Sequence, residues 1–184
     1  MNDGRLFVTS EGCSPHRLFR SNPSNSDREE LNHKPMPPTL ILGFGNPLRS
    51  DDGVGSKAAA MLEAELSPRE LLVIAAHQLT PEMAEPVARS SRVLFLDAAH
   101  TGVPGEIRCQ RVLRDPEFQP GSGSHDLAPS ALLELAARYF HAQPEAWLLT
   151  ITGDNFDLGE SFSPALQADW ESYLDRIRAW VCGV

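Results

Sequence analysis

Two adjacent aspartates, Asp51 and Asp52, stand between a glycine-rich turn and a helix-forming segment. The turn ends the apolar run of ILGFGNPLRS and contains Gly43 and Gly45. A glycine-rich turn after a strand can cradle a phosphate, but two carboxylates at the start of the next helix would repel one. Pro47 also removes a backbone donor from this turn. These features argue against a nucleotide site and favour a ligand of positive charge.

Further carboxylates and imidazoles follow other apolar runs of the chain. Asp97 comes directly after VLFL, so its side chain is expected to be partly buried and to need a backbone donor, a cation or a metal as partner. His77 and His100 also follow apolar runs, and His125 lies in the glycine-rich stretch QPGSGSHDL. The residues alone do not choose among these three histidines, and one member of the Asp51–Asp52 pair can instead cap the following helix.

Two carboxylates and one imidazole, brought from separate strand ends, can bind a divalent metal and leave positions open for water or substrate. Oxygen and nitrogen donors without thiolate suit nickel, zinc or manganese, and chemistry alone does not select among them. The three cysteines, Cys13, Cys109 and Cys182, are widely separated and form no CxxC pair. This spacing argues against both a disulfide framework and a thiolate zinc site, and it indicates a reducing compartment.

From Thr39 onward, apolar runs of strand length alternate with helix-forming segments. The runs predict strands over 39–44, 71–77, 92–99, 105–113 and 146–153, and helices over 55–66, 81–90, 128–140 and from Pro164 to the end. Strands that alternate with helices pair in parallel through right-handed crossovers. We therefore expect an α/β three-layer sandwich, with a mostly parallel sheet flanked by helices and an antiparallel edge strand over 105–113. In such sheets, ligands bind at the carboxyl ends of the strands, where the strand order reverses.

The final helix has the clearest pattern. Ser163 is a good N-cap and Pro164 a good first residue, and an apolar stripe follows. The stripe consists of Leu166, Trp170, Leu174 and Ile177. We interpret its aromatic residue as part of the core and not as a binding site.

Composition and charge limit the function. The 184 residues, 41% hydrophobic and 22% charged, are enough for one folded domain. The net charge of −9 and the absence of a basic stripe argue against nucleic acid or an anionic membrane as partner. No apolar run has the length of a membrane span or of a signal-peptide core, so a cytoplasmic location is expected.

Residues 1–37 differ from the remainder. They are rich in Ser, Asn and Pro and show no periodic apolar face, which predicts a disordered N-terminal extension before a single domain over 38–184. Met36, just before the first strand, is an alternative translation start.

Four blocks of the sequence resemble the hydrogenase maturation proteases, in the order found in that family. The blocks are ILGFGNPLRSDDGVG, HQLTPEMAE, LFLDAAH and GSHDLAPSALLELA, and ITGDNFDLGESFSPAL is similar to the family's last strand and loop. The resemblance covers roughly 39–184. It implies a single domain with a five-stranded sheet and an endopeptidase that removes the C-terminal peptide from the large-subunit precursor of a nickel-iron hydrogenase, after nickel has been inserted into the precursor.

The family's metal ligands, carried onto this chain, are Asp52, Asp97 and His125. Some members have Glu at the position of Asp52, so Asp51 can also share the role. The resemblance implies that the ligands engage nickel held by the precursor, with Asp52 and Asp97 as catalytic groups, although other divalent metals can occupy the site.

The turn residues around these ligands are expected to form the substrate-binding loop: Gly43, Gly45, Asn46, Asp51 and Gly53. Neither a Gly-x-Ser-x-Gly elbow nor an HExxH motif is present, so serine-hydrolase and common zinc-protease mechanisms are not expected. Two alternatives use the same cleft: a metal-dependent chaperone or carrier that holds the precursor without cutting it, and a metal-dependent hydrolase of a small molecule.

Overall fold

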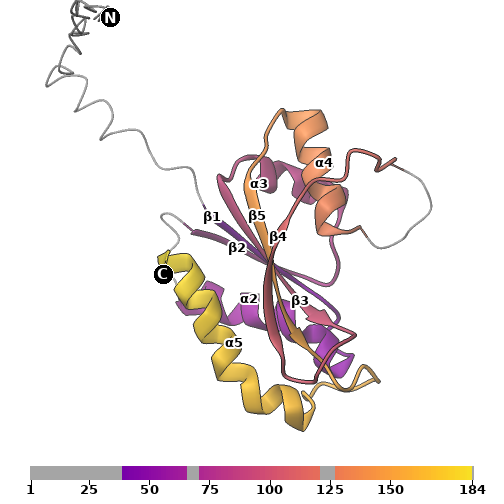
Figure 1. The fold of residues 1–184 in the computed structure, drawn as a ribbon, viewed down its shortest axis with the longest axis vertical. Coiled ribbons are helices and arrows are strands. Elements are labelled where there is room, and N and C mark those ends of the chain that lie inside the picture. The colour runs from indigo at the N-terminus through magenta and orange to yellow at the C-terminus, as the bar shows by residue number, and fades with distance from the viewer. Residues whose placement is uncertain (1–38, 66–70, 121–126, 184) are drawn as a thin grey trace, which may run out of the picture. The chain divides into compact units, whose positions relative to one another are not determined.

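A computed structural model of the chain describes residues 39–65, 71–120 and 127–183 (Figure 1). These residues belong to one compact unit, Met36–Val184. The predicted N-terminal extension, residues 1–37, and the alternative start at Met36 lie outside the described residues. None of the helices in the described part of the chain has the length and apolar character that crossing a bilayer requires.

Five strands form one sheet in the described part of the chain. They are β1 (Thr39–Phe44), β2 (Leu71–Ala76), β3 (Arg92–Ala99), β4 (Ile107–Val112) and β5 (Glu145–Thr152), in the order β2-β1-β3-β5-β4. The first three neighbouring pairs are parallel, and β4 pairs with β5 antiparallel at the edge. The predicted mostly parallel sheet with an antiparallel edge strand is confirmed.

Helices cover both faces of the sheet, as Figure 1 shows. Helices α2 (Val54–Glu65) and α5 (Pro164–Cys182) cover one face, and α3 (Ala84–Ala88) and α4 (Pro129–Phe140) cover the other. Two 3₁₀ turns, η1 (Ser50–Gly53) and η2 (Pro81–Met83), precede α2 and α3. The predicted helix over 81–90 therefore consists of η2 followed by the shorter α3.

Each face of the sheet has its own apolar core, because neighbouring side chains of a strand point to opposite faces. On β1, Ile41 packs beneath α2 and α5, whereas Leu40 and Leu42 pack beneath α3 and α4. All three side chains have no exposed surface. A strand covered on both faces must be apolar at successive positions, which is why the continuous run TLILGF folds as β1, inside the sheet between β2 and β3.

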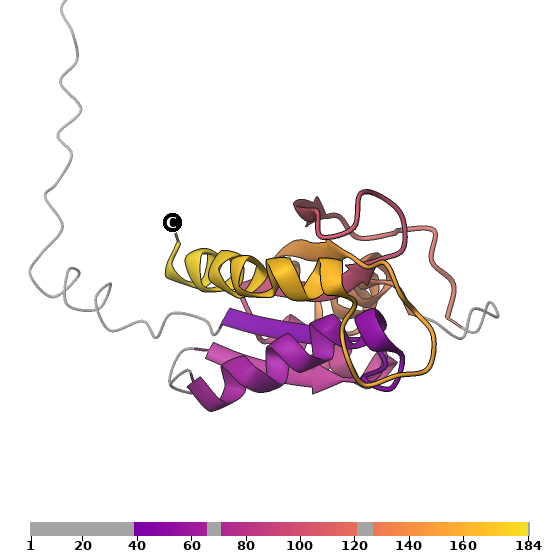
Figure 2. The same cartoon turned by 90° about the horizontal axis from the view of Figure 1, so that it is seen from below.

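Helix α5 is positioned by its cap and its apolar stripe. The Leu166 N–H donates to Ser163 Oγ at 3.3 Å, and Pro164 occupies the first turn. Leu166, Leu174 and Ile177 have no exposed surface and Trp170 is buried, all within the core beneath α2 and α5. The predictions of the Ser163 cap and of a core role for the aromatic residue are confirmed. Figure 2 shows α5 beside α2 on this face.

The strand order reverses direction between β1 and β3. The chain passes from β1 outward to β2 and then returns to place β3 on the other side of β1. Loops that leave β1 and β3 therefore diverge at their carboxyl ends and leave a crevice, which is the usual ligand site of an open parallel sheet.

Candidate active site

A cavity of about 440 Å³ lies at this switch point. Its walls come from the segments that follow β1, β2 and β3, with one residue from the approach to α4. The lining residues are Phe44, Gly45, Asn46, Arg49, Asp52, His77, Gln78, Leu79, Asp97, His100 and Leu127. The cavity thus brings together two of the predicted carboxylates and two of the histidines that sequence reasoning left open.

Asp97 is the more strongly perturbed of the two carboxylates. It lies within β3 near its carboxyl end, where burial raises the pKa of Asp97 from 3.8 to about 7. A hydrogen bond of 2.8 Å from the Ala98 N–H opposes this rise in pKa, and repulsion from Asp52 adds to it. A carboxyl group whose pKa lies near neutral pH can both accept and donate a proton there.

Asp52 faces Asp97 from η1, the turn that joins β1 to α2. The Asn46 N–H donates to Asp52 Oδ2 at 2.8 Å, which fixes the carboxylate against the preceding turn. The side chain of Asp52 is 26% exposed, so it is accessible from the cavity. The Asn46 side chain in turn accepts from the Leu48 N–H at 2.9 Å, so this turn is held by hydrogen bonds at both ends.

His100 stands beside Asp52 at the rim of the cavity. Its Nε2 lies 3.8 Å from Asp52 Oδ1, and its ring stacks on that of Phe156 with centroids 3.9 Å apart. The Arg49 Nε donates to the Phe156 carbonyl at 3.1 Å. The stacking partner comes from the loop between β5 and α5, so the position of His100 depends on a segment more than 50 residues away in the sequence.

Asp51 lies outside this cavity and performs a different task. Its side chain has no exposed surface, and its carboxylate accepts three backbone N–H groups of the loop between β5 and α5. The donors are Asp154 and Asn155, to Oδ2 at 2.8 and 3.0 Å, and Ser163, to Oδ1 at 2.7 Å. Burial alone would raise the pKa of Asp51, but these hydrogen bonds outweigh burial and lower it.

The Asp51 contacts join two loops that are about 100 residues apart in the sequence. Figure 2 shows the loop after β5 curling around the start of α2. Ser50 N donates to the Gly159 carbonyl at 2.7 Å, and Gly159 N donates to the Leu48 carbonyl at 2.9 Å. Asp51 therefore fixes the loop that carries Phe156, the ring on which the cavity residue His100 stacks.

Close packing requires glycine at three positions of the segment ILGFGNPLRSDDGVG. A Cβ on Gly43 would lie 2.0 Å from the Gly55 carbonyl oxygen, because β1 and the start of α2 are in contact there. Gly45 has φ +127°, and a Cβ there would lie 1.9 Å from the Asp52 carbonyl oxygen. A Cβ on Gly53 would lie 2.6 Å from the Pro47 Cα. These contacts hold η1, and hence Asp52, against β1.

His125 lies outside the described residues, as does Asp126. Leu127, two positions after His125 in the sequence, lines the cavity. Within residues 39–65, 71–120 and 127–183, no group of three or more His, Cys, Asp or Glu side chains has the arrangement of a metal site. Asp52 and Asp97 offer carboxylate oxygens, and a metal site needs further donors besides these two side chains.

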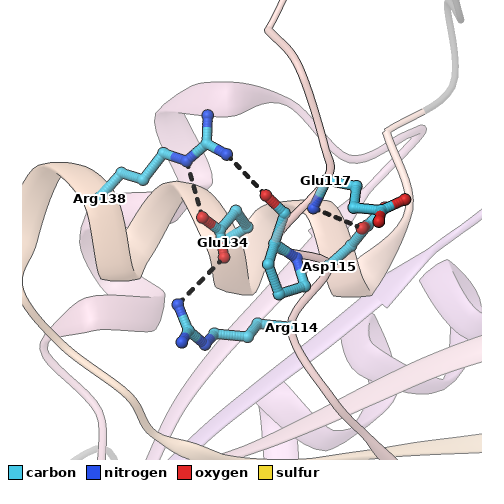
Figure 3. Close-up of polar contacts among 6 residues, drawn as sticks. Arg114, Asp115, Glu117, Glu134 and Arg138 are labelled. Carbon is cyan, nitrogen blue, oxygen red and sulfur yellow. Dashed lines mark hydrogen bonds and ion pairs between the residues drawn. The ribbon is translucent and has the colours of Figure 1, made fainter.

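Residues 114–116, which follow β4, are fixed on α4 (Figure 3). Glu134 is buried in α4, and its carboxylate binds Arg138 at 2.7 Å and Arg114 at 3.4 Å. Arg138 also donates to the Pro116 carbonyl at 3.0 Å, and Asp115 N donates to the Ser130 carbonyl at 3.1 Å. Residues 114–116 are therefore held beside the start of α4, from which Leu127 reaches the cavity.

The fold is similar to that of solved α/β proteins that include hydrogenase maturation proteases. A [NiFe] hydrogenase maturation protease, HycI, from Thermococcus kodakarensis has a TM-score of 0.61 and 21% identity, with 77% of this chain and 90% of that chain covered. The hydrogenase maturating endopeptidase HybD from E. coli also has a TM-score of 0.61 and 21% identity, with 79% and 93% covered.

A third structure, the hydrogenase 3 maturation protease, has a TM-score of 0.56 and 23% identity, with 78% of this chain and 90% of that chain covered. No protein-family model and no curated protein sequence matches this chain. At these identities the likeness establishes the fold, and it agrees with the resemblance carried by the sequence motifs.

Proposed function

We propose that this protein is an endopeptidase that removes the C-terminal peptide from the nickel-loaded large-subunit precursor of a nickel-iron hydrogenase. The observation that carries the proposal is the meeting of Asp52 and Asp97 in one cavity at the switch point of the sheet. The motif resemblance and the likeness to hydrogenase maturation proteases support the choice of substrate.

Asp97 is the group best suited to move the proton during hydrolysis. In its charged form it takes a proton from the water whose oxygen attacks the scissile carbonyl carbon. The C–N bond then breaks as the leaving amide nitrogen gains a proton, which the neutral form of Asp97 can return. Burial, which raises the pKa of Asp97 to about 7 in the metal-free site, supports this role.

Asp52 is placed to orient the substrate and, with Asp97 and His125, to engage the nickel that the precursor carries. Carboxylate oxygen and imidazole nitrogen are suitable donors for nickel. The nickel ion would either polarise the scissile carbonyl or serve as the signal that distinguishes a loaded precursor from an empty one. In both cases the metal arrives as part of the substrate, and this chain contributes the two carboxylates of the cavity.

The test is intact-mass spectrometry of a hydrogenase large-subunit precursor, prepared with and without nickel and incubated with this protein. Loss of one defined C-terminal peptide from the nickel-loaded precursor alone is the expected result. A stable complex without cleavage would instead identify a chaperone or carrier that uses the same cavity. Cleavage of the precursor regardless of nickel would support a peptidase but remove the proposed role of the metal.

A further inference from the structure

A second hollow, of about 340 Å³, lies beside the cavity at the outer edge of the sheet. We call it the β2-edge groove, and it is lined by Pro47, Ser56, Lys57, Ala60, Ala75, Ala76 and His77. Successive residues of a strand point to opposite faces, so a hollow lined by both Ala75 and Ala76 lies along the edge of β2 and not on one face of the sheet.

The β2-edge groove and the cavity adjoin each other. His77 lines both, and the consecutive residues Asn46 and Pro47 line one each. A chain that occupies the groove can therefore continue past His77 into the cavity that contains Asp52 and Asp97. The groove has the position of a subsite next to the reacting bond.

The lining of the groove favours an apolar side chain. Three alanines and a proline form most of its wall, and the one cationic residue is engaged elsewhere. The Lys57 ammonium donates to the Glu160 carbonyl and lies 4.5 Å from the centre of the Phe162 ring. Lys57 thus presents its aliphatic stem to the groove, and a small aliphatic side chain is the complementary occupant.

The outer edge of β2 provides the backbone partners for an extended peptide. β2 is the last strand in the sheet order, and in the described part of the chain no strand pairs with its outer edge. Alternate residues of an edge strand direct their N–H and C=O groups outward, where a peptide can add as a further strand. Leu72 and Ala75 are exposed residues of this strand.

We infer that the β2-edge groove binds the precursor segment adjoining the scissile bond, as an extended strand added to β2 with an aliphatic side chain in the groove. This inference rests on the proposed function, since it takes the precursor as the occupant. It adds that backbone pairing and one apolar subsite position the C-terminal peptide, independently of the metal that the precursor carries.

Amide hydrogen exchange of β2 tests the added strand directly. Asp97→Asn protein, used so that the complex stays uncut, is mixed with nickel-loaded precursor, and exchange at residues 71–76 is compared with that of the free protein. We expect exchange in β2 to slow by at least about tenfold in the complex. Unchanged exchange in β2 while the precursor is bound elsewhere, or no complex at all, would overturn the inference.

A matched pair of substitutions on α2 tests the subsite. Ala60 lines the groove and its neighbour Met61 does not, and both are exposed. Ala60→Glu, and Ala75→Glu on β2, should raise KM for the precursor at least about tenfold with kcat changed less than about twofold, whereas Met61→Glu should change neither. Equal kinetics for all three variants and the wild type would contradict the subsite.

The two proposals fail in distinguishable ways. If the wild-type protein binds the precursor without cutting it, the proposed peptidase is wrong. Protection of β2 and weaker binding by Ala60→Glu would then still establish the groove as the docking site. If the wild type cuts the precursor but β2 stays unprotected, only the groove is wrong.

Discussion

Asp51 and Asp52 are consecutive in the chain, yet their carboxylates serve different parts of the molecule. The carboxylate of Asp51 is fully buried and accepts the backbone N–H groups of Asp154, Asn155 and Ser163. That of Asp52 lines the cavity and accepts the Asn46 N–H. One aspartate of the pair thus fixes the loop between β5 and α5, and the other is available to a substrate.

This division predicts that substitution at the two positions changes stability by unequal amounts. Asp51→Ala removes the acceptor of three backbone donors, so the free energy of unfolding should fall by about 3 kcal/mol. Asp52→Asn should change it by less than about 1 kcal/mol, because Asp52 is partly exposed and accepts one such bond. Urea denaturation of both variants at pH 7 measures this, and equal losses would show that Asp51 has no special structural role.

The pH dependence of the Asp51 contribution has a defined sign. Because the pKa of Asp51 is lowered below 3.8 in the folded protein, its stabilisation is present above that value and is lost as the pH falls through the folded pKa. The stability difference between wild type and Asp51→Ala should therefore shrink in acid. A difference that stays constant from pH 7 to pH 2 would contradict this assignment.

The contribution of Asp97 to stability should depend on pH in the opposite direction to that of Asp51. Between pH 3.8 and about 7 the folded protein keeps the proton that the unfolded chain releases, so the contribution of Asp97 to stability falls as the pH rises through this window. Asp97→Asn removes the buried charge and should be more stable than the wild type at pH 8 by about 2 to 4 kcal/mol. Thermal unfolding of the metal-free wild type and variant at pH 4 and pH 8 measures this stability difference. A variant equally stable, or less stable, at pH 8 would contradict the raised pKa.

His100 lines the cavity beside Asp52, and its ring stacks on that of Phe156. Removing the imidazole by His100→Ala should lower cleavage of the precursor by about tenfold, and Phe156→Leu, which removes the ring on which it stacks, should lower it by a smaller factor. His141→Ala is the control, because His141 is exposed at the end of α4 and lies outside the cavity. Full activity of His100→Ala would leave this imidazole without a role in the site.

The buried carboxylate of Glu134 predicts a stability effect that surface ion pairs lack. In Figure 3 it bridges Arg114 and Arg138. Glu134→Gln leaves both guanidinium groups without their anionic partner and should lower the free energy of unfolding by about 2 kcal/mol. Arg111→Gln, which breaks an exposed pair with Glu145 at 3.9 Å, should cost less than about 0.5 kcal/mol. Similar losses in both variants would contradict the importance of burial.

Much of the fold follows from local sequence pattern. The continuous apolar runs predict β1 and β3 with the observed bounds, and Ser163 and Pro164 predict the start of α5. The helix over 81–90 is less regular than expected, because η2 turns the chain before α3 begins. The meeting of Asp52 and Asp97 also follows from the sequence, since residues at the carboxyl ends of neighbouring parallel strands share one edge of the sheet.

Other parts of the site depend on contacts that local pattern does not contain. The partners of Asp51 are more than 100 residues away, and the stacking of His100 on Phe156 requires that this distant loop be in place. Sequence reasoning left His100 open, because a histidine that follows a strand has no local signal that separates a site residue from a surface one. The three glycines assigned to the substrate loop, Gly43, Gly45 and Gly53, are explained here by close backbone packing.

The most direct test of the account is a comparison of the wild type with Asp97→Asn on nickel-loaded precursor, with cleavage and binding measured separately. Cleavage is followed by intact mass under single-turnover conditions, and binding by size-exclusion chromatography of the uncut complex. We predict that Asp97→Asn still forms a complex with the precursor but cuts it at least about 100-fold more slowly. Cleavage at the wild-type rate by Asp97→Asn would contradict the assignment of Asp97 as the group that moves the proton.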